Sequence, residues 1–286
     1  MTIALSVKVH DGLVLATDSA TTLVASNGDG GVTVQNVYNS GNKLFNLMKG
    51  WPIGATTWGA GSIGAVSIAT LAKDLRRRFG GLDPSCPGWQ LDRSTYTVEM
   101  VAEYAKAFLY DELYAECHRG KAEREAPPLG FCVAGYSAGA PLPEIWVIEM
   151  GGGKHPEPRC VAPQDNCCID PHGEPEAIHR LIAGCGLRLG DALRDLGVPE
   201  DQVMPAVNSI RAKLEVPLLA APMPIQDAID LARYLVETTI GFIRFVPGAS
   251  TVGGPVDIAA ITKHEGFRWV QRKLYYDRHL NPREDT

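Results

Sequence analysis

Residues 2–19 restrict the fold of this chain more than any other segment. The first half of the segment carries an apolar side chain at every second position: Ile3, Leu5, Val7 and Val9. Side chains alternate between the two faces of a strand, so this pattern predicts a strand with one apolar face. The turn sequence His-Asp-Gly at residues 10–12 leads into a second apolar run at residues 13–16. The chain is therefore predicted to begin with a β-hairpin.

Thr2 stands directly behind the initiator methionine, at the head of the first predicted strand. A methionine before a small residue is normally removed in the cytoplasm, and its removal would make Thr2 the N-terminus. An N-terminal threonine carries a hydroxyl nucleophile together with an α-amine that can act as its base. Thr2 is therefore the candidate nucleophile of the chain.

The segment at residues 2–19 resembles the start of mature proteasome β-subunits and their bacterial relatives, which are N-terminal nucleophile hydrolases. In that family a catalytic threonine opens a strand, and the second strand ends in a catalytic aspartate, which Asp18 matches. The family then places a lysine on a later strand beside the threonine, and Lys43 in residues 42–47 matches it. Lys43 comes later than the family spacing, and the excess predicts an enlarged loop at residues 26–35.

The resemblance implies a role for each matching residue. Lys43 would lower the pKa of the Thr2 amine and stabilise negative charge on the hydroxyl. Asp18 would orient the ammonium through a charge-assisted hydrogen bond. The backbone N–H of Gly61, at the start of a predicted helix, would form the oxyanion hole. The competing interpretation is a frayed terminus, with Asp18 at a hairpin end and Lys43 in solvent.

The composition argues against several classes of function. The chain has 286 residues, enough for one large core, and its hydrophobic (45%) and charged (21%) contents are typical of a soluble globular protein. A net charge of −6, with no basic run longer than residues 76–78, argues against nucleic-acid binding. No apolar stretch reaches the length of a membrane span. The seven cysteines, with no signal peptide, predict reduced thiols and a cytoplasmic protein.

The apolar periodicity predicts the order strands, two helices, strands, helices, strands. The predicted helices are residues 65–79, 97–119, 174–196, 200–214 and 225–244, and the later strands are residues 53–58, 129–135, 144–150, 256–262 and 267–270. Enlarged loops are predicted at about 20–40, 80–96 and 151–172, and an extra helix at about 198–216. The whole chain, 1–286, is thus predicted as one α+β domain. Its fold class is the four-layer αββα sandwich, two antiparallel sheets flanked by helix pairs, of N-terminal nucleophile hydrolases.

Two glycine-containing motifs have alternative interpretations. Residues 59–64 form a G-x-G-x-x-G sequence, but Gly80, Gly81 and a proline-containing loop follow where a dinucleotide fold needs a second parallel strand. Residues 135–139 match the G-x-S-x-G elbow of α/β-hydrolases. Two prolines and another strand follow Ser137, where the elbow needs a helix, so a hairpin turn is predicted.

A group of potential metal ligands falls in the predicted loop at 151–172: His155, Cys160, Cys167, Cys168 and His172. Their spacing matches none of the paired patterns of structural zinc sites. We therefore interpret them as reduced cysteines and histidines of an irregular loop, and predict no metal and no cofactor.

The chain departs from the family at two supporting positions. The family carries a serine before its third helix, and residues 170–175 hold none. The family also places an aspartate and a serine just before a final glycine pair. Aligning that pair with Gly253 and Gly254 leaves Ser250 or Thr251 as substitutes. Ser250 is included among the candidate catalytic residues.

Three functions are compatible with these patterns. The first is a threonine-type peptidase or amidohydrolase that forms an acyl ester on Thr2. The second is a catalytically inactive, ring-forming subunit, and the third is an amidase for a small amide. The tyrosines at positions 96, 104, 110 and 114, spread around one predicted helix, suggest an interface and therefore a homo-oligomeric ring. The resemblance also implies an unfolded protein or peptide substrate and an ATP-driven unfoldase partner.

Overall fold

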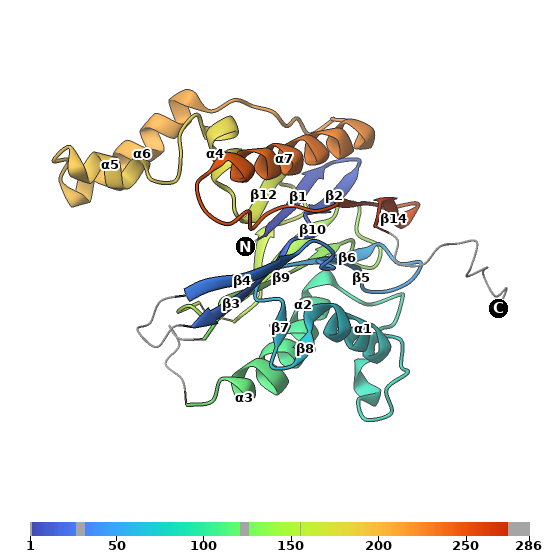
Figure 1. Cartoon of the computed structure of the whole chain (residues 1–286). Helices are drawn as coiled ribbons and strands as arrows, with labels where there is room; N and C mark the ends of the chain where they lie inside the picture. The colour runs from blue at the N-terminus through green and yellow to red at the C-terminus, as the bar shows by residue number, and fades with distance from the viewer. Residues whose placement is uncertain (1, 27–31, 121–125, 155, 274–286) are drawn as a thin grey trace.

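The computed structural model describes residues 2–26, 32–120, 126–154 and 156–273. The fold is mixed α+β and contains two five-stranded antiparallel sheets (Figure 1). The first sheet, in spatial order, consists of β12 (Cys168–Gly173), β1 (Ile3–Val9), β2 (Gly12–Thr17), β13 (Asp257–Thr262) and β14 (Gly266–Gln271). The second consists of β11 (Arg159–Ala162), β10 (Glu144–Met150), β9 (Leu129–Gly135), β6 (Ile53–Gly59) and β5 (Leu44–Asn46).

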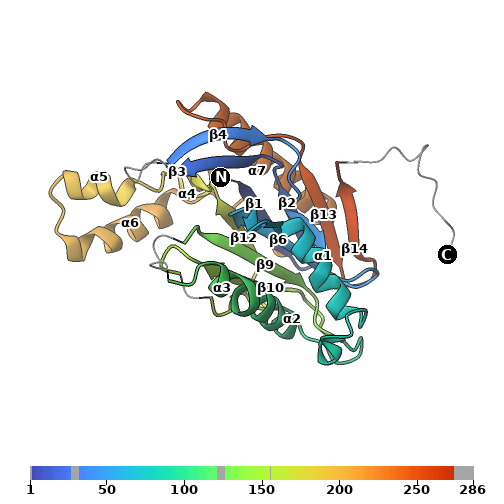
Figure 2. The same ribbon diagram turned by 60° about the horizontal axis from the view of Figure 1, so that its bottom comes forward.

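Helices cover the outer faces of both sheets (Figures 1 and 2). The second sheet packs against α1 (Ile68–Phe79) and against α2 (Val98–Lys106), which continues as a π-helix (Ala107–Tyr114) into α3 (Ala115–Cys117). The first sheet packs against α4 (Glu176–Ala183) and α7 (Ile225–Phe245). A third apolar cluster, which includes Leu15, Ala134 and Ile261, lies between the two sheets. The two sheets therefore stack face to face between helices.

The predicted opening hairpin is confirmed. β1 and β2 pair in an antiparallel register that places Ala4 opposite Thr17. The alternating residues Ile3 and Val7 are fully buried in the cluster beneath α7. The other face of β1 is also buried, because the second sheet covers it.

The predicted loop at 151–172 is wrong, because the chain forms β11 and β12 within it. These are the edge strands of the two sheets, and β12 pairs with β1. Neither strand alternates between buried and exposed residues, and β12 contains Pro171. An edge strand tolerates proline because one side of it needs no hydrogen-bonding partner. Such a strand gives almost no signal in the sequence.

Other boundaries also differ from the prediction. The predicted loop at 20–40 is largely a hairpin of β3 (Thr21–Ser26) and β4 (Val32–Tyr38), with residues 27–31 outside the described part. Helix α1 begins at Ile68 rather than at residue 65, because the ribbon of β7 (Ser62–Ile63) and β8 (Val66–Ser67) precedes it. The predicted helix at 174–196 is two helices. The first ends at Gly184, whose left-handed backbone (φ +67°) terminates it.

The tyrosines expected at an interface belong to the core of the chain itself. Tyr96 and Tyr114 are almost fully buried, and Tyr104 and Tyr110 pack partly buried against the same cluster. The aromatic rings therefore cover the second sheet and its own loops. They do not support the predicted ring.

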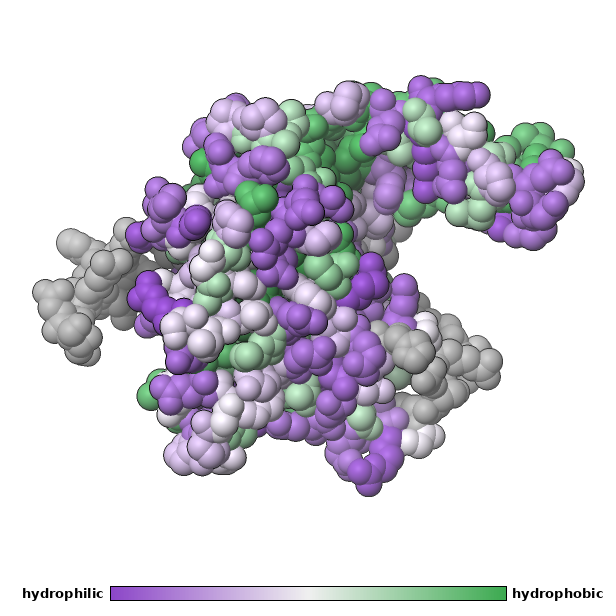
Figure 3. Space-filling view, turned by 180° about the vertical axis from the view of Figure 1, so that it is seen from behind, coloured by the Kyte–Doolittle hydropathy of each residue, from purple (hydrophilic) through white to green (hydrophobic). Residues whose placement is uncertain are grey.

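Helices α5 (Leu189–Asp195) and α6 (Glu200–Leu214) form an arm that projects from the body beside α4 (Figures 1 and 2). The arm carries exposed apolar side chains, including Leu196 (81% exposed) and Met204, and Figure 3 shows green apolar patches on it. Within the described ranges, the arm included, no helix is long and apolar enough to cross a membrane.

Lys8 anchors the segment that crosses from one sheet to the other. Its side chain is fully buried, and its Nζ donates to the carbonyl oxygens of Ala162 (3.5 Å), Gln164 (3.1 Å) and Pro163. These three carbonyls lie where β11 ends and the chain turns towards β12. Because buried carbonyls need donors, the ammonium of Lys8 stabilises this crossover.

Lys8→Met should lower the free energy of unfolding by about 2 kcal/mol, because the buried carbonyl of Ala162 and the part-buried carbonyls of Pro163 and Gln164 lose a charged donor. Urea denaturation measures the change. The control is Lys154→Met, since Lys154 is exposed and its ion pair with Glu149 spans 3.6 Å. The control should change stability by less than about 0.5 kcal/mol. Equal stabilities of Lys8→Met and wild type would contradict the anchoring role.

Candidate active site at the N-terminal strand

Asp18 is the centre of the candidate site. Its carboxylate is fully buried and accepts four hydrogen bonds. Oδ1 accepts from the backbone N–H of Ile3 (3.1 Å) and from Nζ of Lys43 (2.6 Å). Oδ2 accepts from the backbone N–H groups of Ala20 (3.0 Å) and Gly253 (2.9 Å). Four segments of the chain therefore meet at one carboxylate.

This geometry changes the role expected for Asp18. A carboxylate offers about four lone-pair sites, and here Ile3, Lys43, Ala20 and Gly253 occupy all four. In this structure Asp18 therefore holds Lys43 and the peptide after Thr2, whereas the sequence suggested that it would hold the Thr2 ammonium.

Thr2 lies at the head of β1 and is 3% exposed. Its carbonyl accepts from the backbone N–H of Glu174 (2.8 Å), directly after β12. Gly173 has φ +89°, and a Cβ at this position would lie 1.9 Å from the Thr2 carbonyl oxygen. Only glycine fits so close to this backbone. The edge strand β12 thus sets the position of Thr2.

Lys43 is positioned by the start of β5. Its carbonyl accepts from the backbone N–H of Thr57 on β6 (2.9 Å), and the next residue, Leu44, is buried between the sheets. Burial lowers the pKa of Lys43, against the opposing attraction of Asp18. The amine is therefore easier to deprotonate than an exposed lysine.

The structure brings together only three of the five predicted site residues. Asp18 binds Lys43 directly, and it reaches Thr2 only through the backbone N–H of the next residue, Ile3. Gly61 is exposed and lies against Thr21, close in sequence to Asp18. Helix α1 begins only at Ile68, so the prediction that Gly61 lies at the start of this helix is wrong. Among the described residues, no hydrogen bond links Gly61 to the other three.

Ser250 lies on the surface, and its hydroxyl donates to the carbonyl oxygen of Val252 (3.5 Å). Thr251 is buried, and its Oγ1 has no hydrogen-bonding partner in the described part of the chain. The same is true of Thr17, next to Asp18. Thr17 and Thr251 therefore carry buried hydroxyls without a partner in the described part of the chain, whereas Ser250 is exposed.

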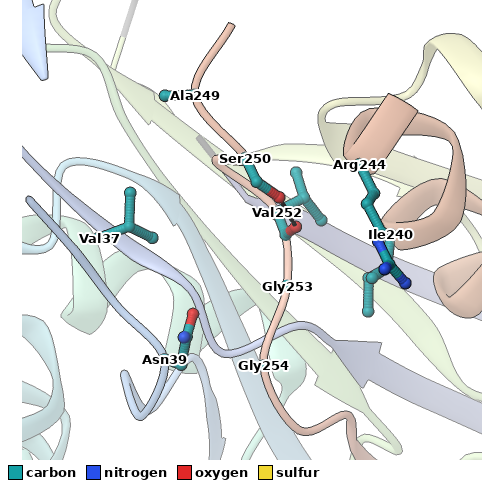
Figure 4. Close-up of a pocket in the computed structure, with 9 residues that line it drawn as sticks. All are labelled: Val37, Asn39, Ile240, Arg244, Ala249, Ser250, Val252, Gly253 and Gly254. Carbon is teal, nitrogen blue, oxygen red and sulfur yellow. Dashed lines mark hydrogen bonds between the residues drawn. The ribbon is translucent and has the colours of Figure 1, made fainter. Parts of the chain in front are cut away.

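A hollow of about 480 Å³ opens beside the site. Figure 4 shows Val37 and Asn39 on one side of it and Ile240 and Arg244 of α7 on the other. The loop at residues 249–254 forms the remaining wall. This loop includes Gly253, the donor to Asp18, so the hollow adjoins the site through one backbone segment.

The histidines and cysteines of the predicted loop are spread over two strands. His172 on β12 stacks on Trp58 (3.9 Å between ring centroids) and contacts Asp170 (2.9 Å). Cys160 lies on β11 of the other sheet, and His155 falls outside the described residues. Within the described ranges, no three of His, Cys, Asp and Glu are grouped as metal ligands.

Neither a protein-family model nor a curated protein sequence matches this chain. The assignment of the candidate site therefore rests on the geometry described above and on the resemblance of the N-terminal segment.

The sequence did not indicate several residues of the site. Gly173 and Glu174 were missed because β12 has no strand pattern. Ser19 and Lys273 were missed because they meet only in the folded chain, where Nζ of Lys273 donates to Oγ of Ser19 (2.7 Å). One signal was present in the sequence. Asp257 is a charged residue within an otherwise apolar predicted strand, and such a residue needs a partner if it is buried.

Asp18→Asn should lower the free energy of unfolding by about 3 kcal/mol, because the amide cannot accept four hydrogen bonds and leaves Lys43 buried without a counter-charge. Asp230→Asn is the matched control, since Asp230 is an exposed partner of Arg233. Its effect should stay below about 0.5 kcal/mol. Urea denaturation compares both with wild type, and a similar small effect at the two positions would contradict a central role for Asp18.

Proposed function

We propose that this protein is a threonine-type amidohydrolase whose nucleophile is Thr2 after removal of Met1, with peptide bonds as its substrate. One observation carries the proposal. A single buried carboxylate oxygen, Oδ1 of Asp18, accepts both from Lys43 and from the peptide N–H directly after Thr2. Two hydrogen bonds thus connect the ammonium of Lys43 to the peptide group that joins Thr2 to Ile3.

The reaction uses the two functional groups of Thr2. The hydroxyl attacks the scissile carbonyl, while the α-amine accepts the hydroxyl proton and passes it to the leaving amine. The product is an acyl ester on Thr2. Water then attacks the ester, with the same amine as base, and releases the acid. The positive charge of Lys43 favours the neutral amine and the developing oxyanion.

The arrangement of the layers supports the same proposal. Two antiparallel sheets stack between α4 and α7 on one side and α1 and α2 on the other. We propose that this is the four-layer αββα sandwich of N-terminal nucleophile hydrolases, with Thr2 at the head of an inner strand. The resemblance of residues 2–19 to proteasome β-subunits points to the same class.

A catalytically inactive, ring-forming subunit is the alternative, and the occupancy of Asp18 favours it. With all four acceptor sites taken, Asp18 has none left for the Thr2 ammonium. Retention of Met1, detected by intact mass, would block the α-amine and support this alternative. The proposed ring would use surfaces other than the buried tyrosines, such as the exposed apolar residues of the α5–α6 arm. An unfoldase partner is proposed from the resemblance alone.

Thr2→Ala should abolish hydrolysis of fluorogenic peptides without unfolding the protein, because it removes the hydroxyl nucleophile and only one methyl group besides. Thr2→Ser, which keeps a hydroxyl nucleophile, is the matched variant and should retain measurable activity. Intact mass verifies Met1 removal in each preparation, and circular dichroism verifies folding. A processed Thr2→Ala protein with wild-type activity would exclude Thr2 as the nucleophile.

Lys43→Ala should lower kcat at least about a hundredfold, because the charge that favours the neutral amine is lost. Lys43→Arg should also be defective, since a planar guanidinium does not replace a compact ammonium between two buried segments. The exposed Lys154→Met serves as the charge-matched control. Wild-type rates in either Lys43 variant would show that the lysine only stabilises the fold.

A further inference from the structure

A second buried ion pair lies next to the Asp18 cluster. Nζ of Lys273 contacts the carboxylate of Asp257, and the backbone N–H of Lys273 donates to the same carboxylate (2.9 Å). The side chains of Asp257 and Lys273 are 2% and 8% exposed. Asp257 opens β13 and lies opposite Thr17 of β2, the residue before Asp18. Both ion pairs therefore flank the end of β2.

Ser19 joins the second pair to the first. Its hydroxyl accepts from Nζ of Lys273 (2.7 Å) and donates to the carbonyl of Pro255 (2.5 Å). Its backbone N–H donates to the carbonyl of Gly253 (2.9 Å), and its carbonyl accepts from Gly41 (2.8 Å). Ser19 is fully buried. The residue after Asp18 is thus bonded to the loop that also supplies a donor to Asp18.

These hydrogen bonds form a chain that leads from Lys273 to Asp18. Lys273 holds Ser19, Ser19 holds Gly253, and Gly253 donates to Asp18. The positive charge of Lys273 also contributes, after burial, to lowering the pKa of Lys43. Lys273 therefore acts on Lys43 in two ways: through the hydrogen bonds that lead to the carboxylate of Asp18, and through its own positive charge.

We propose that Lys273 is a positioning residue of the Thr2 site, which fixes Ser19 and thereby the orientation of Asp18 towards Lys43. This inference rests on the proposed amidohydrolase function for its kinetic consequence. Its structural consequence is that the backbone amides of Ala20 and Gly253 stay bonded to Asp18, and this does not depend on activity. A lysine near the end of the described chain thus completes a site whose nucleophile lies at residue 2.

Two measurements on Lys273→Met test the proposal. Hydrogen exchange of the Ala20 and Gly253 amides, which donate to Asp18, should accelerate at least tenfold. In peptide hydrolysis kcat should fall at least tenfold with KM unchanged, because Lys273 acts through Ser19 and Asp18 on Lys43 and not on the substrate. Ser19→Ala, a smaller change, should show the same pattern at both amides if Lys273→Met does not fold.

The control is Lys154→Met, which also removes an amine, but one that is exposed and whose ion pair with Glu149 spans 3.6 Å. It should leave exchange at Ala20 and Gly253 within twofold of wild type and keep kcat. Unchanged exchange at both amides in the Lys273→Met and Ser19→Ala variants would overturn the proposal. A wild-type protein without hydrolytic activity would overturn the proposed function instead, and the exchange data would still decide the role of Lys273.

Discussion

The buried carboxylate of Asp18 is the interaction on which the N-terminal site depends. Removing a charge from water is costly unless hydrogen bonds replace the lost hydration. Here the donors come from β1, from the turn after β2, from the start of β5 and from the loop after α7. Folding therefore has to bring these segments together, and each one places a further group near Thr2. The hydrogen bonds to Asp18 are therefore required both for the fold and for the site.

The edge strand β12 shows how an unremarkable segment can determine a site. Its last residue, Gly173, passes so close to the Thr2 carbonyl that a side chain would collide with it. The same strand carries His172, stacked on Trp58 of the opposite sheet. β12 thus places the terminus on one sheet and contacts the other. A loop in its place would leave Thr2 without its pairing partner.

The sequence predicted the opening hairpin well and the edge strands poorly, for one physical reason. Ile3, Leu5, Val7 and Val9 alternate because α7 covers one face of β1. The other face carries Ser6 and Lys8, which look solvent-exposed in a sequence but are buried by the second sheet. β12 lacks any alternation, since its residues are half-buried throughout. Periodicity reports burial, and it fails where both faces have similar surroundings.

The amino-acid sequence predicts the local part of the site: a tight turn between two strands, which brings Asp18 back to Thr2 and Ile3. A short hairpin has a register set by its turn, so this proximity follows from adjacent residues. The meeting of Lys43, Gly253 and Lys273 at this place is visible only in the folded chain. Their meeting depends on sheet pairing and on loops closed over long separations, and neither has a periodic trace in the chain. The same holds for Gly61 and Ser250, whose motif positions were clear but whose places relative to Thr2 were set by the packing of whole segments.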